Sequence, residues 1–199
     1  MSPRRRTVAV TIFVAALTAA CGSGQSGGQP TPAPGPVVTA DQIDELVVPA
    51  EQLPGALHPD RVPAPAAGQV GKCPYAPGDT AALFAPGSLA LRTVRYTGAG
   101  NVFVDQAVGV YPSNDAARAA FIALTDTVRS CQSQSLTVEP DRVTWQVLRS
   151  SQVSGTAEPY ATDARVAENV VFVVDVGMLS PQVGASVADA IEGKIRSRA

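Results

Sequence analysis

Histidine is almost absent from this chain of 199 residues, which contains only His58. A Ser/His/Asp triad would have to use that side chain, and the sequence has no Gly-x-Ser-x-Gly turn to present a nucleophile. Zinc needs about four nitrogen, sulfur or carboxylate ligands, which one histidine and two distant cysteines do not supply. A phosphate-binding loop is missing as well. We therefore expect no metal site and no cofactor, and a His58 that is exposed or locally hydrogen-bonded.

The chain also lacks an excess of positive charge and a long apolar run. It has 15 lysines and arginines against 17 aspartates and glutamates, whereas a nucleic-acid partner would need the opposite balance. The uncharged segment of residues 7–20 is too short to cross a membrane, which takes about 20 apolar residues. We therefore expect neither a nucleic-acid partner nor a membrane-spanning helix.

The N-terminus has the pattern of an export signal. Arg4 to Arg6 precede the uncharged segment, whose small residues Thr18-Ala19-Ala20 lead directly into Cys21. This junction resembles the lipobox of bacterial lipoproteins, in which the cysteine is lipidated and becomes the mature N-terminus. We expect residues 1–20 to be removed and Cys21 to carry a diacylglycerol and palmitate anchor on the extracytoplasmic face of the cell membrane. A soluble exported protein with an incidental Cys21 is the alternative.

Residues 21–38 consist mostly of Gly, Ser, Gln, Thr and Pro and offer almost nothing apolar to bury. Such a segment cannot offset the entropy cost of folding, so we expect a flexible tether. Gly22, Gly24 and Gly27 match the spacing of a dinucleotide-binding loop, but no predicted strand precedes them and no predicted helix follows. The composition changes near Thr39, where a folded domain of residues 39–199 is expected to begin.

Two kinds of periodicity predict an α+β fold. Strands are predicted from alternating or continuous apolar runs at residues 89–97, 101–111, 142–150, 157–166 and 170–176. Helices are predicted from apolar residues three and four apart, with the two main ones beginning after Ser113 and Ser180. The first should run to about Ser133. A short helix capped by Thr39 or Asp41 should begin the domain, with Ile43, Leu46 and Val47 as its apolar residues. The proline-rich residues 48–88 should be mostly loop with short helical turns. We expect an antiparallel sheet of about five strands with two main helices packed on it, and the valine side of the 101–111 strand in the core.

Two cysteines remain after Cys21, and export into an oxidising compartment favours their pairing. Cys131 ends the apolar stripe of the first main helix, and Cys73 lies in the proline-rich loop, so the two thiols can meet. We therefore predict a disulfide between Cys73 and Cys131 that fastens the long loop to the helix.

Charged and aromatic side chains on the predicted strands are the candidate binding residues. Convergent polar groups in a concavity are typical of ligand sites, and such a cleft would form here if the strands are neighbours. The candidates are Arg95, Asp105, Tyr111, Arg149 and Asp175. Asp105 and Asp175 could instead meet across the sheet as a catalytic carboxylate pair. The simpler interpretation is that both aspartates are solvated on the outer faces of their strands.

Several of these segments resemble one family. They are Gln106-Ala107-Val108, Val110-Tyr111-Pro112-Ser113 before an alanine-rich helix, and Asn169-Val170-Val171 before an apolar strand. They are similar to the PknH-like sensor domains of mycobacterial receptor kinases and lipoproteins, over roughly residues 40–197. The family carries four cysteines, paired first with second and third with fourth. Cys73 and Cys131 match the first pair, whereas the second pair has no counterpart and its last cysteine would fall near Gly177.

The resemblance implies a sensor domain outside the cell membrane. We expect a monomeric, non-enzymatic lipoprotein, held to the membrane by its N-terminal lipid, that binds a small envelope ligand or an envelope protein. The alternatives are a hydrolase that uses an acidic residue pair and a structural or chaperone-like lipoprotein. Carboxylates about 5 to 10 Å apart in a cleft would favour the hydrolase, and a shallow polar groove would favour binding.

Overall fold

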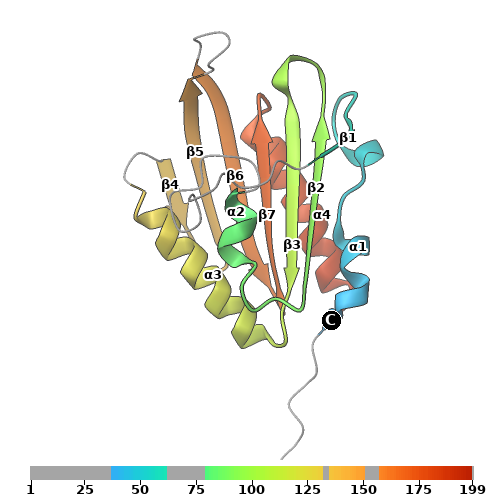
Figure 1. The fold of residues 1–199 in the computed structure, drawn as a ribbon, viewed down its shortest axis with the longest axis vertical. Coiled ribbons are helices and arrows are strands. Elements are labelled where there is room, and N and C mark those ends of the chain that lie inside the picture. The colour runs from blue at the N-terminus through green and yellow to red at the C-terminus, as the bar shows by residue number, and fades with distance from the viewer. Residues whose placement is uncertain (1–36, 62–78, 132–134, 151–156, 199) are drawn as a thin grey trace, which may run out of the picture. The chain divides into compact units, whose positions relative to one another are not determined.

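Seven antiparallel strands form one sheet in the order β1-β2-β3-β7-β6-β5-β4 (Figure 1). The structure is a computed structural model that describes residues 37–61, 79–131, 135–150 and 157–198. The strands are β1 (His58–Asp60), β2 (Ala90–Thr97), β3 (Phe103–Val110), β4 (Ser135–Val138), β5 (Arg142–Ser150), β6 (Ala157–Ala167) and β7 (Val170–Gly177). The most apolar strand, β7, lies in the middle, and the short strands β1 and β4 form the two edges.

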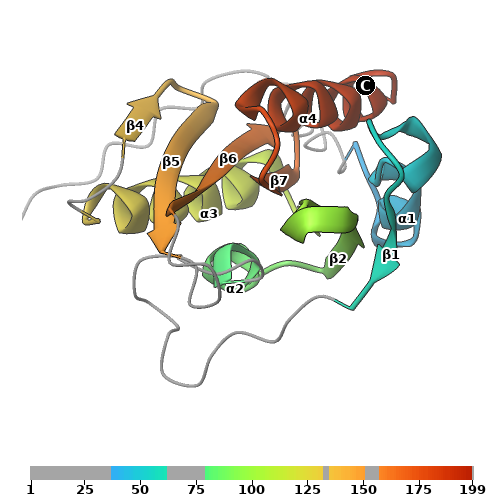
Figure 2. The same cartoon turned by 90° about the horizontal axis from the view of Figure 1, so that it is seen from above.

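Helices cover both faces of this sheet. The α-helices of the described residues are α1 (Ile43–Leu46), α2 (Asp79–Phe84), α3 (Asn114–Arg129) and α4 (Pro181–Arg196), with single 3-10 turns at Ala40–Gln42, Ala50–Gln52 and Ala99–Asn101. Figure 2 shows α4 on one face of the sheet and α2 and α3 on the other. The protein therefore has three layers with a core on each side of the sheet.

The expected α+β class with an antiparallel sheet is confirmed, but the expectation of about five strands and two main helices is wrong. The two missed strands are the edges, of three and four residues, and β1 contains Pro59. Strands this short show too little alternation to stand out, and proline is tolerated only at a sheet edge. The short helix expected after Thr39 is present as α1, with Ile43 and Leu46 buried. Helix α2 has six residues and lies within the stretch expected to be mostly loop, where so short a helix shows too little periodicity to identify.

Both faces of β3 are buried, so the expectation that only its valine side would be in the core is too narrow. All eight residues of β3 have low exposure. Val104 and Val108 pack in the core beneath α4, whereas Ala107 packs in the core beneath α2 and α3. A strand between two helical layers needs no solvated face, which explains why its polar residues are also buried.

The two long helices begin where the sequence predicts. The Ser113 hydroxyl accepts a hydrogen bond from the Ala116 amide at the start of α3, and Ser180 caps α4, whose first residue is Pro181. This proline fits because the first helical amide has no intrahelical partner. Helix α3 ends at Arg129, about four residues earlier than expected.

Two buried amide side chains hold the N-terminal segment against the sheet. Asn169 accepts a hydrogen bond from the Val38 amide at 3.0 Å and donates to the Val38 carbonyl at 2.7 Å. Gln106 makes the same pair of bonds with the amide and carbonyl of Val48, both at 2.8 Å. Each side chain therefore satisfies the backbone amide and carbonyl of one residue, as a neighbouring strand would.

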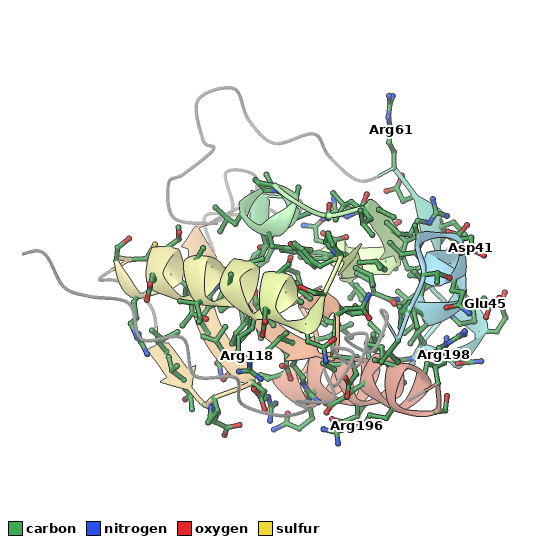
Figure 3. All side chains as sticks on the ribbon, turned by 90° about the horizontal axis from the view of Figure 1, so that it is seen from below. Asp41, Glu45, Arg61, Arg118, Arg196 and Arg198 are labelled. Atoms are coloured by element: carbon green, nitrogen blue, oxygen red, sulfur yellow. The ribbon has the colours of Figure 1, made fainter. Side chains whose placement is uncertain are left out.

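The C-terminal helix fastens the same segment from the other side. Lys194 donates to the Val47 carbonyl at 2.7 Å, and Arg198 pairs with Glu45 at 2.5 Å. Figure 3 shows Glu45 and Arg198 close together near the end of α4. Side-chain contacts therefore join the N-terminal segment of the domain to its C-terminal helix.

The predicted signal, anchor and tether over residues 1–36, with Cys21, lie outside the described residues, as does Cys73. Cys131 is described: its side chain is buried, as expected, at the end of α3. The disulfide with Cys73 stays a prediction. No helix in the described part of the chain is long and apolar enough to cross a membrane.

Candidate functional site

A row of polar side chains crosses four neighbouring strands on the face covered by α2. Arg95 of β2 lies opposite Asp105 of β3, Asp105 opposite Asp175 of β7, and Asp175 opposite Thr162 of β6. The next partner in the same row is Trp145 of β5. Because directly opposite residues project from the same face of a sheet, their side chains are neighbours.

Arg95 and Asp105 form a buried two-pronged ion pair. Nε of Arg95 donates to Oδ1 of Asp105 at 2.6 Å, and Nη2 donates to Oδ2 at 2.8 Å. Their side chains are only 11% and 7% exposed. Burial raises the pKa of Asp105 above its usual value, and the hydrogen bonds and charge of Arg95 offset part of that rise. The pair fixes the guanidinium in one orientation.

Asp175 is bound by hydroxyl groups instead. Thr162 donates to its carboxylate at 2.5 Å, and Thr80 of α2 contributes a second side-chain hydrogen bond. The pKa of Asp175 is raised to about 7, mainly by burial and to a smaller extent by the negative charge of Asp105, while the two hydroxyls and Arg95 offset part of the rise. Asp175 therefore changes charge near neutral pH, which is unusual for an aspartate.

A polar cavity of about 540 Å³ opens beside this row, at the end of β2 and β3. Its polar lining includes Asp60, Arg95, Thr97 and Asn101, and its aromatic lining is Phe103 and Tyr160. Arg95 thus belongs both to the ion pair and to the cavity. The cavity has groups of both charges and several hydrogen-bonding side chains.

Phe103 connects the ion pair to the cavity wall. The Arg95 guanidinium lies 4.8 Å from the centre of its ring, close enough for a cation–π contact, and the ring centre of Tyr160 lies 5.3 Å away. The ring also covers Gly177, where an added β-carbon would lie 1.9 Å from it. The position near which the family's fourth cysteine would fall therefore has no room for a side chain unless Phe103 moves.

The structure brings together three of the five predicted site residues, Arg95, Asp105 and Asp175. The interpretation of the two aspartates as solvated is wrong, because Asp105 is 5% exposed and Asp175 is only partly exposed beneath α2. Tyr111 lies at the other end of β3, where it is buried and donates to the Phe84 carbonyl, and burial raises its pKa to about 12. The side chain of Arg149 lies outside the described residues, and its backbone pairs with Glu158.

Sequence reasoning missed the cavity residues Asp60, Thr97 and Tyr160 and the hydroxyls of Thr80 and Thr162. The pairing of Asp60 with Arg95 depends on the missed strand β1. Nothing in the sequence around Thr162 marks it as a site residue, because only the register of β6 and β7 places it opposite Asp175. No group of three or more His, Cys, Asp or Glu in the described residues is arranged to hold a metal ion.

Comparison with known proteins identifies one family. Residues 76–198 match the family of PknH-like extracellular domains. The crystal structure of the extracellular domain of PknH from Mycobacterium tuberculosis has the same fold, with a TM-score of 0.65 and 17% sequence identity, over 81% of this chain and 98% of that one. No curated protein matches the sequence.

Proposed function

Because this chain belongs to the family of PknH-like extracellular domains, we propose that it is an extracytoplasmic receptor that binds a small polar ligand and carries out no reaction on it. The ligand site is the cavity beside β2 and β3. The observation that carries the proposal is the Arg95–Asp105 pair, which presents a fixed guanidinium at the wall of an open polar cavity.

The lining of the cavity indicates the chemistry of the ligand. Asp60 accepts hydrogen bonds, Arg95 donates them, and the Thr97 hydroxyl can do either. A ligand that carries both donors and acceptors, such as a polyhydroxylated compound, satisfies all three. The volume lies within the range of roughly 300 to 1,000 Å³ that small-molecule sites occupy.

The binding proposal can be tested by native mass spectrometry of the exported full-length protein. A small molecule should co-purify with the wild type and be lost from the double variant Asp60→Ala/Thr97→Ala, which removes two polar groups of the lining. Asp126→Ala is the matched control, because it removes an exposed carboxylate on α3 away from the cavity. Equal retention by all three proteins, or no bound molecule in any, would contradict the proposal.

An acid–base hydrolase is the second candidate, favoured by the raised pKa of Asp175 opposite Asp105. Asp105 argues against it, since both of its oxygens accept bonds from Arg95 and little of it is exposed. A nucleophile or base needs a free lone pair within reach of the substrate. Hydrolysis of a glycoside by the wild type that both Asp105→Asn and Asp175→Asn abolish would establish this second function instead.

We also propose that Cys21 anchors the protein through lipid to the extracytoplasmic face of the cell membrane. Cys21→Ala should move the protein from the membrane fraction to the soluble exported fraction, because two acyl signals are needed for stable attachment and both depend on this residue. Immunoblotting of fractionated cells measures the distribution. A variant that still sediments with membranes would contradict the anchor.

A further inference from the structure

Asp175, which is half-buried, differs in its partners from the buried aspartates Asp105 and Asp163. Asp105 is paired with Arg95, and Asp163 is paired with both Arg142 and Arg165. Within the described residues, the side-chain hydrogen bonds to Asp175 come from the hydroxyls of Thr162 and Thr80 and no salt bridge reaches it. A buried carboxylate that lacks a cation is stabilised by holding a proton.

The neighbours of Asp175 couple its charge electrostatically to the residues of the cavity. Directly opposite on β3 is Asp105, whose own partner on β2 is Arg95. The hydroxyls of β6 and α2 face it as well, and α3 packs on the same side with the apolar residues Phe121, Leu124 and Val128. Further titratable groups at this end of the sheet include His58, Asp60 and Arg61 at β1 and Tyr160 on β6. The charge of Asp175 therefore acts on both members of the Arg95–Asp105 pair.

We propose that a proton on Asp175 sets the electrostatic state of the Arg95–Asp105 pair, and so makes the cavity a pH-dependent binding site. With the proton bound, one carboxylate matches one guanidinium. Without it, two carboxylates lie near that guanidinium and the site gains a negative charge. This regulation rests on the proposed function of the cavity.

The route from Asp175 to the cavity is short and continuous. Arg95 contacts the ring of Phe103, and Phe103 contacts both Tyr160 and the β7 backbone at Gly177, two residues beyond Asp175. Loss of the proton should weaken the binding of anionic groups and strengthen that of cationic groups. A raised pKa near 7 places the change between about pH 6 and pH 8.

The intrinsic fluorescence of Trp145 can report this titration. Trp145 is the single tryptophan, is 2% exposed, and lies in the same cross-strand row as Asp175, with Thr162 between them. Its fluorescence and the amide NMR signals of Phe103 and Tyr160 should be followed from pH 5.5 to 8.5 in the full-length exported protein. In the wild type, all three should change with a common midpoint near pH 7.

Two variants decide the assignment. Asp175→Asn should abolish the common transition, whereas His58→Gln should leave it, which separates Asp175 from the histidine that contacts Thr97 at 3.4 Å. A transition that survives in Asp175→Asn, that disappears in His58→Gln, or that leaves the Phe103 and Tyr160 signals unchanged would overturn the proposal. The titration uses no ligand, so its failure leaves the binding proposal intact, and an empty cavity in the mass spectrum leaves the titration intact.

Discussion

Asp175→Asn should stabilise the protein at pH 8 by as much as about 4 kcal/mol. The folded-state pKa near 7 exceeds the unfolded value of 3.8, so between about pH 4 and pH 7 the folded state holds a proton that the unfolded state releases. The stability that this proton contributes falls with rising pH across that window and is absent above about pH 7. About three pKa units at roughly 1.4 kcal/mol each give the upper limit. Asparagine has the same shape, can still accept the Thr162 hydrogen bond, and carries no charge to bury.

Denaturant unfolding of wild type and variant at pH 4.5, 6 and 8 measures this effect. The difference between the two proteins should be small at pH 4.5 and grow toward pH 8, while other carboxylates affect both proteins alike. Asp126→Asn, an exposed aspartate on α3, should show no such pH-dependent gain. A wild type as stable as Asp175→Asn at pH 8 would contradict the assigned ionisation.

Arg95→Met should destabilise the protein by about 3 to 5 kcal/mol at pH 8. The change leaves Asp105 buried without its guanidinium, and removing one partner of a buried pair costs the full desolvation of the other. The neighbouring Asp175 increases the cost because it is ionised at that pH. The loss should shrink at acid pH, where Asp105 can take up a proton.

A double-mutant comparison separates the ion pair from simple packing loss. Asp105→Asn in the Arg95→Met background should recover a large part of the stability, since no charge is then buried unpaired at that position. Arg92→Met is the control from the same strand, because Arg92 and Asp44 are 50% and 73% exposed. It should cost less than about 1 kcal/mol. Equal losses for Arg92→Met and Arg95→Met would contradict the role of the buried pair.

The long elements of the fold could be predicted because each carries its own signal. The two main helices have a capping serine and an apolar stripe, and the five longer strands have apolar runs bounded by turn residues. The edges β1 and β4 carry neither. Their pairing depends on a neighbouring strand, which is tertiary information that a stretch of three or four residues does not contain.

The site could be predicted only in part, because it depends on register and on what covers each face. The predicted turn at residues 98–100 would place Arg95 opposite Phe103, whereas the observed connection between Thr97 and Phe103 is two residues longer and places Arg95 opposite Asp105. Their burial does not follow from the sequence either, since strand alternation gives no sign that α2 and α3 lie over that face. Tyr111 lies on the same strand face as Asp105, but the six residue steps between them correspond to about 20 Å, which places Tyr111 at the far end of the strand.

The hydrogen bonds between Asn169 and Val38 place the start of the domain and the cavity at opposite ends of the sheet. The chain enters the domain at Val38, beside Asn169, at the Val170 end of β7, whereas the cavity lies beside Gly177 at the other end of that strand. The seven residue steps between these ends correspond to about 24 Å. A ligand that enters the cavity therefore does so at the end of the sheet remote from the point where the chain enters the domain.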